Sequence, residues 1–396
     1  MPTKAAARTR FLNNPVNHFY MMMISTSILV VLGLIMVFSA SSIHAIDTKG
    51  YAFAVVLRQL IFLLAGVPFA VWLARLPLQY WSVIAKFGLV LSIILVGIVM
   101  IPGVGKEVNG NRNWIDLKVI DIQPGEFTKF LLILWAAYML ARKESMQRTK
   151  FNVIALIGPG FLLVIAGIMR GGDLGTTSVI AAIAAGLFFV SGVELKKMGW
   201  VAAAGFLALA AGIVTSDYRR ARFLVFLNPF APEEYKNFGW QPAHSLLGLA
   251  SGGLFGVGLG GSRQKWGNLA EAHTDFIFSV IGEELGLVGT LAVLILVGTL
   301  VYSIFRIALR AKDPFSRYVC AGVAVWIGIQ AILNIGTAIS VLPVVGVTLP
   351  LVSYGGSALL TTICALGFVA GVALRDSEIS KELVLSLIHI SEPTRH

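Results

Sequence analysis

The chain has 396 residues, of which 57% are hydrophobic and only 13% are charged. Soluble proteins carry a charge on about a quarter of their residues, so this composition excludes an ordinary soluble domain and favours a protein embedded in a membrane. The net charge of +11 comes from short basic clusters between apolar blocks, a pattern typical of the cytoplasmic loops of membrane proteins rather than of a nucleic-acid-binding surface.

The apolar runs between charged breaks give ten candidate transmembrane helices, since crossing a bilayer takes roughly 20 residues of helix. The expected transmembrane helices cover residues 18–40, 53–74, 81–101, 126–141, 152–169, 176–193, 198–215, 281–305, 318–340 and 356–374. We therefore predict an all-α integral membrane protein, with a single membrane domain over residues 18–375.

Lys and Arg are unevenly divided among the predicted loops. They are in excess in the segment 1–17 and in every even-numbered loop, whereas acidic residues offset them in the first, third and fifth loops. Because basic loops stay in the cytoplasm, both termini are predicted to be cytoplasmic, including the tail 376–396. Ser386–Arg395 resembles translated sequencing-adapter read-through, so this tail is expected to be partly non-native.

Three predicted outward segments are candidates for function. Two are much longer than a turn needs: 103–124, and a large extracytoplasmic loop between helices seven and eight at roughly 216–280. The third, 342–357, contains two prolines and two adjacent glycines, so it cannot form a regular helix and must line protein or a cavity. We expect the chemistry on the outer face.

The large loop ends in Glu-Ala-His-Thr-Asp at 271–275, directly before an apolar helix. One interpretation is a helix cap, in which Thr274 or Asp275 accepts a hydrogen bond from a free amide. The other is a general base for a sugar hydroxyl, and either Asp275 or His273 could serve. The residues alone leave these alternatives open.

Glu126 and Lys129 stand three residues apart, on one face of the expected fourth helix. They form either a structural ion pair or, through Lys129, part of a cation cluster around a diphosphate. Two further acids, Glu283 and Glu284, are expected in a non-transmembrane or re-entrant turn, because 276–305 is too long for one span.

A glycine-rich stretch at 256–261 precedes Arg263 and Lys265. It is either a tight turn or a backbone nest that, with the two cations, approaches an anionic headgroup. It is not a dinucleotide fingerprint, which requires a preceding strand. The basic run 219–222 is typical of a contact with the membrane surface.

Together these motifs resemble the SEDS family of shape, elongation, division and sporulation proteins, over roughly residues 18–375. The motifs that carry the resemblance are Val108-Asn109-Gly110 with Trp114, Gln123-Pro124 with Glu126 and Lys129, Asp173-Leu174-Gly175-Thr176, Phe226-Leu227-Asn228-Pro229, Gly256–Gly260 with Lys265, Glu271–Phe278, Gly282–Gly286, and Thr348-Leu349-Pro350 with Ser353–Ser357. Where the family usually has an Arg before the Trp, this chain has Asn113.

The resemblance implies a peptidoglycan glycosyltransferase that polymerises lipid II at the outer face of the bacterial cytoplasmic membrane during cell division, because the motifs are more similar to the division members of the family than to the elongation members. It also implies a class B penicillin-binding protein and other divisome proteins as partners. The acid that the family requires for polymerisation falls on Asp275. The expected substrate-binding residues are Glu126, Lys129, Arg112, Arg222, Arg263, Lys265, His273 and Ser353.

No cofactor is required by the sequence, and no metal-ligand cluster is visible in it, although a magnesium or manganese ion would be compatible with a diphosphate substrate. Two other functions are consistent with the same residues. One is a flippase or transporter for lipid II, which would need a polar route through the bilayer. The other is a noncatalytic scaffold that activates a partner synthase.

Overall fold

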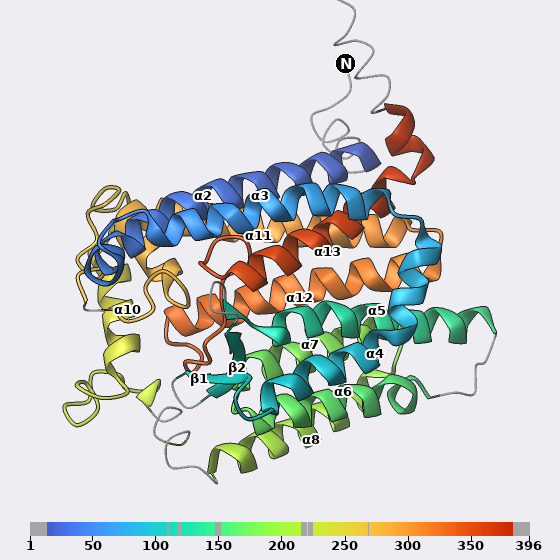
Figure 1. The fold of residues 1–396 in the computed structure, drawn as a ribbon, viewed down its shortest axis with the longest axis horizontal. Coiled ribbons are helices and arrows are strands. Elements are labelled where there is room, and N and C mark those ends of the chain that lie inside the picture. The colour runs from blue at the N-terminus through green and yellow to red at the C-terminus, as the bar shows by residue number, and fades with distance from the viewer. Residues whose placement is uncertain are drawn as a thin grey trace, which may run out of the picture.

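The computed structural model describes residues 14–108, 111–116, 121–146, 152–214, 220, 225–267 and 269–382. A helix occupies each of the ten predicted apolar runs, and the long helices lie side by side in one bundle (Figure 1). They are α2 (Pro15–Lys49), α3 (Ala54–Arg75), α4 (Leu78–Met100), α5 (Pro124–Ser145), α6 (Val153–Arg170), α7 (Leu174–Val190), α8 (Leu195–Val214), α11 (Ile277–Arg310), α12 (Pro314–Ala338) and α13 (Gly356–Leu374).

The bundle has the character of a membrane domain. Among the described residues, seven helices are long and apolar enough to cross a bilayer, namely α2, α3, α4, α6, α11, α12 and α13. Of the other three, α5 contains the charged Glu126 and Lys129, and α7 is apolar but has only 17 residues. The chain is therefore a multi-pass membrane protein, as its composition predicts.

Local sequence explains where several helices begin and how two of them pack. The side chains of Asp173 and Asp313 accept hydrogen bonds from the amides of Thr176 and Ser316, in the first turns of α7 and α12, which is the usual role of an acidic N-cap. Gly367 of α13 lies against Ala70 of α3, where a Cβ would overlap the alanine backbone. Small residues at such crossings let membrane helices approach closely.

The first helix is longer than predicted. It continues to Lys49, whereas the apolar run ends near residue 40, because residues 41–49 contain no proline or glycine and the helix stops at Gly50 with φ 81°. The additional turns extend α2 toward the end of the bundle that carries the large loop (Figure 1).

The prediction of a purely helical protein is corrected at one segment. Three short strands, β1 (Gly105–Val108), β2 (Asn111–Asp116) and β3 (Asp121–Ile122), form a small antiparallel sheet in the order β1-β2-β3. Charged and apolar residues do not alternate regularly here, so the period-two signal of a strand is weak. The large loop contains a further helix that was not predicted, α10 (Trp240–Ser251).

Helix α11 is interrupted at Gly286, whose φ of 67° and ψ of −162° lie in a region open essentially to glycine. The glycine-rich segment fills the interruption. Its Val257 and Gly258 amides donate to the carbonyls of Glu283 and Glu284, while Leu287 donates to the carbonyl of Gly253. A break at membrane depth is tolerated when its freed backbone groups are paired in this way. The expected turn around the two glutamates is thus a broken helix.

Candidate functional site

Asp275 lies two residues before α11. This helix begins at the end of the bundle that carries the sheet and α10, opposite the described chain ends (Figure 1). Its backbone is held by α12, because the Asn334 side chain donates to the carbonyl of Asp275 at 2.8 Å and to that of Val347 at 2.7 Å. The Asp275 side chain is half-buried. A Cβ placed on Gly346 would lie 3.5 Å from its Oδ2, so the carboxylate faces the segment between α12 and α13.

That segment, residues 339–355, contains most of the irregular stretch 342–357 that the sequence predicts to line protein or a cavity, and we call it the wall of the candidate site. It is joined to the residues beside Asp275 by two further bonds. The Ser353 hydroxyl donates to the carbonyl of Thr274 at 2.6 Å, and the Tyr354 amide donates to that of His273 at 2.9 Å. The expected wall is thus in direct contact with the candidate base. Ser353 itself is buried and also accepts from the amide of Leu349.

His273, the other candidate base, lies between two rings. Its imidazole is 5.8 Å from that of His44 on α2 and 5.6 Å from the Tyr354 ring. Burial lowers the pKa of His273 below its usual value of 6.5, the Glu271 carboxylate opposes this effect, and His44 lowers the pKa further. The lowered pKa favours the neutral form of the imidazole at pH 7.

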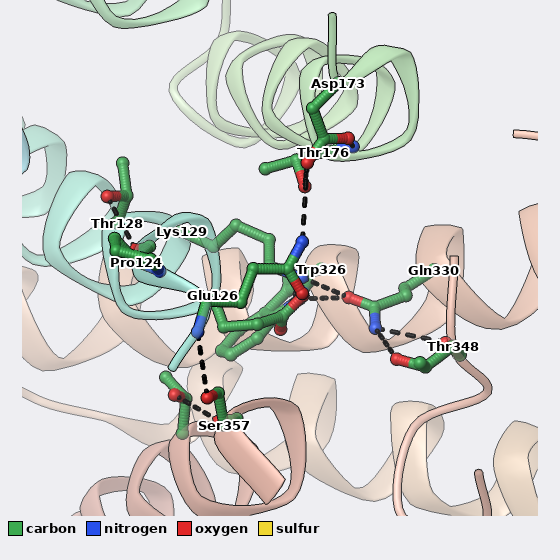
Figure 2. Close-up of polar contacts among 12 residues, drawn as sticks. Pro124, Glu126, Thr128, Lys129, Asp173, Thr176, Trp326, Gln330, Thr348 and Ser357 are labelled. Carbon is green, nitrogen blue, oxygen red and sulfur yellow. Dashed lines mark hydrogen bonds and ion pairs between the residues drawn. The ribbon is translucent and has the colours of Figure 1, made fainter. Parts of the chain in front are cut away.

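Glu126 and Lys129 form a buried ion pair with Nζ 2.7 Å from Oε2, and their side chains are 7% and 1% exposed. Lys129 also donates to Gln330 at 2.8 Å and lies 5.2 Å from the centre of the Trp326 ring. Gln330 in turn donates to the carbonyl of Thr348 in the site wall at 3.1 Å (Figure 2). The ion pair is therefore connected to the wall through the Gln330 side chain.

A second polar cluster lies where α5 and α7 begin, and the sequence pointed to only part of it. Asp173 accepts bonds from the Thr176 amide at 2.8 Å, from Asn113 at 2.9 Å and from Gln123 at 3.4 Å. The backbone amide of Gln123 also donates to the hydroxyl of Ser357 at the start of α13. Asn113, which replaces the family's usual Arg, thus links strand β2 to Asp173 at the start of α7. Figure 2 shows Asp173 beside Thr176.

The remaining basic candidates are in different environments. The Lys265 side chain is buried and lies 3.5 Å from Glu284. Arg263 is exposed, and its backbone amide donates to the Glu283 carboxylate at 2.9 Å. Arg112 is in β2, where its amide donates to the carbonyl of Gly171 at 2.9 Å. Arg222 lies outside the described residues. No group of three His, Cys, Asp or Glu side chains suited to a metal ion occurs in the described ranges.

Comparison with known proteins gives consistent matches over the membrane domain. The model of a family described as cell cycle proteins, for FtsW, RodA and SpoVE, matches residues 19–378. A probable peptidoglycan glycosyltransferase FtsW of Mycobacterium tuberculosis is 36% identical over 380 residues, covering 95% of this chain and 72% of the relative.

Two solved structures have the same fold. One is from work on a peptidoglycan synthase complex that coordinates polymerization and crosslinking, with a TM-score of 0.73 and 29% identity, covering 89% of this chain and 96% of that one. The other is the rod shape determining protein RodA of Thermus thermophilus, with a TM-score of 0.65 and 28% identity, covering 89% and 95%.

Proposed function

The chain belongs to the family of FtsW, RodA and SpoVE cell cycle proteins, and from this premise we propose that it is a peptidoglycan glycosyltransferase that polymerises lipid II during cell division. The relative from Mycobacterium tuberculosis is named a probable peptidoglycan glycosyltransferase. The observation that carries the proposal is the place of Asp275, half-buried beside the irregular wall and held by Asn334 through its own carbonyl. A fixed backbone with a partly accessible carboxylate is the arrangement that a general base needs.

In the proposed reaction, the Asp275 carboxylate takes the proton of the 4-hydroxyl of the acceptor's N-acetylglucosamine. The oxygen attacks the anomeric carbon of the donor's N-acetylmuramic acid, and the bond from that carbon to the diphosphate breaks. Undecaprenyl diphosphate leaves, with inversion at the anomeric carbon. General-base assistance of this kind contributes about 10²–10⁴-fold, and cations that stabilise the leaving diphosphate add to it.

We assign the predicted basic residues different roles according to their solvent exposure. Arg263 is exposed on the glycine-rich segment, so it is our candidate for direct contact with the diphosphate, where a magnesium or manganese ion would be compatible. Lys129 is enclosed by Glu126, Gln330 and Trp326, so its proposed contribution is to hold the wall. The His273 imidazole favours its neutral form and is stacked, which suits a contact with a sugar face rather than with the diphosphate.

The proposed topology follows the charge distribution of the loops. Ten spans would place residues 1–17 and 376–396 in the cytoplasm, with 18–375 as the membrane domain and the loop 216–280 outside. In support, α2 begins and α13 ends at one end of the bundle, opposite the sheet and α10 (Figure 1). Partners would be a class B penicillin-binding protein and divisome proteins, a proposal supported by the structural similarity to a chain of a peptidoglycan synthase complex.

We expect the purified protein in lipid vesicles to convert lipid II into glycan strands in the presence of moenomycin, which blocks unrelated contaminating transglycosylases. Strands should be measured by gel electrophoresis of labelled product. If lipid II crosses the bilayer while no strands form, the protein is a flippase. If strands form only when a partner transglycosylase is added and moenomycin is omitted, the protein is a noncatalytic scaffold.

A further inference from the structure

Two buried acids have no part in the proposed reaction. Glu283 and Glu284 end the first segment of α11, just before the interruption at Gly286, and their exposed fractions are 1% and 0%. Burying a carboxylate is costly unless it is paired and hydrogen-bonded. The partners of the two acids therefore show what their burial achieves.

Glu284 joins two distant parts of the chain. The Ser39 hydroxyl of α2 lies 2.7 and 2.8 Å from its two carboxylate oxygens. Lys265 Nζ lies 3.5 Å from Oε1 of Glu284 and 3.4 Å from the Ser39 hydroxyl. Lys265 also donates to the carbonyl of Gly260 at 2.5 Å. The lysine is thus turned inward, toward α2 and α11.

Glu283 holds the residues next to Lys265. It accepts bonds from the Ser262 hydroxyl at 2.5 Å and from the Arg263 amide at 2.9 Å. With the backbone pairing of Val257 and Gly258 to the same turn of α11, these bonds fix the glycine-rich segment on the broken helix.

The same contacts determine where the candidate base can lie. The ion pair between Lys265 and Glu284 closes residues 265–284 into a loop, and Asp275 lies inside that loop. Helix α2 contacts the loop twice, because Ser39 binds Glu284 and His44 stacks on His273. Asn334 and Ser353 also hold the backbone of residues 274 and 275, so losing one of the contacts with α2 would loosen the loop on α2 without releasing it.

We propose that Lys265, Glu284 and Ser39 are positioning residues, whose buried cluster fixes the loop 265–284 on α2 and so keeps the Asp275 carboxylate within reach of the acceptor hydroxyl. This inference rests on the proposed function. It assigns Lys265 a role in holding the base instead of a contact with the diphosphate. A misplacement of about 1 Å at a reacting group can reduce a rate by about a hundredfold.

The kinetic test uses Lys265→Met, Glu284→Gln and the double variant in the lipid II assay. We expect each single variant to lower kcat by about tenfold to a hundredfold, with the KM for lipid II within about twofold of wild type. The double variant should lose no more than the worse single variant, because the two residues act as a unit. If Lys265→Met raises KM and leaves kcat unchanged, Lys265 is a substrate ligand. If it changes neither quantity, Lys265 neither binds the substrate nor positions Asp275.

A second readout does not require activity. Thr274→Cys should react with a membrane-impermeant maleimide faster when Glu284→Gln is added, because the loop is loosened; the native Cys320 and Cys364 are buried. An unchanged labelling rate would overturn the proposal even if wild type polymerises lipid II. If the wild-type protein makes no glycan strands, the proposed function is refuted. The labelling rates still test whether the cluster of Lys265, Glu284 and Ser39 holds the loop.

Two variants complete the design. Ser39→Ala removes only one hydroxyl, so it tests the cluster if the charge variants fail to fold; we expect a severalfold lower kcat, unchanged KM and faster labelling. An unchanged kcat and labelling rate in Ser39→Ala would contradict the proposal. The matched control is Lys197→Met, which breaks the exposed pair of Lys197 with Glu194 and should change neither quantity.

Discussion

Replacement of Asp275 by asparagine is expected to reduce the kcat of lipid II polymerisation by about 10²–10⁴-fold, the usual contribution of a general base. Asparagine has nearly the same shape, so the bonds from Asn334 and Ser353 to the backbone of residues 274 and 275 remain available. Folding and lipid II binding should therefore be retained. The measurement is the initial rate of strand formation at saturating lipid II, with moenomycin present.

The control for this change is Asp116→Asn, at the same end of the molecule. The Asp116 side chain is 49% exposed and lies 3.8 Å from Lys106 in the small sheet, so its kcat should stay within about twofold of wild type, as is usual for surface changes. Strand formation by Asp275→Asn at the wild-type rate would contradict the assignment, and His273 would then be the remaining candidate base.

Replacement of Lys129 by methionine is expected to destabilise the protein by about 3–5 kcal/mol, because it leaves the buried Glu126 carboxylate without its cation. Gln330 would lose the hydrogen bond that it accepts from Lys129. The same Gln330 side chain donates to Thr348 in the site wall. The loss should appear as a lower midpoint of thermal unfolding in detergent. It should be accompanied by lower polymerisation, since the wall contacts Asp275.

The double variant Glu126→Gln with Lys129→Met tests the reason for that loss. Removing both charges avoids an unpaired buried carboxylate, so the double variant should unfold at a higher temperature than Lys129→Met alone. If the single variant unfolds at the wild-type temperature and its main defect is a raised KM for lipid II, Lys129 is a diphosphate ligand and not a structural cation.

The membrane domain was predictable from the sequence because a bilayer imposes a simple requirement. Each span must be about 20 apolar residues long, and a described helix lies at every one of the ten predicted runs. The sheet of β1, β2 and β3 was not predictable, because its strands are short and irregular in pattern. The extension of α2 to Lys49 was missed because the helix leaves the apolar region before it ends.

The candidate site could be inferred from the sequence only where its signal is local. Asp275 and His273 stand out as titratable residues just before an apolar helix. Their supports come from distant segments, so adjacency in the sequence could not reveal them. Asn334 and Gln330 left one usable signal, two polar side chains four residues apart in the apolar α12. His44 and Ser39 left none, and the partner of Lys265 became visible only when α11 and the glycine-rich segment were placed together.

The central claim is that residue 275 lies open to the outer face, where lipid II binds. It is tested most directly by labelling Asp275→Cys with a membrane-impermeant maleimide in sealed vesicles of known orientation. We expect labelling from the outer side alone, and a slower rate when lipid II is added. Labelling only from the cytoplasmic side, no labelling in either orientation, or a rate that lipid II leaves unchanged would contradict the claim.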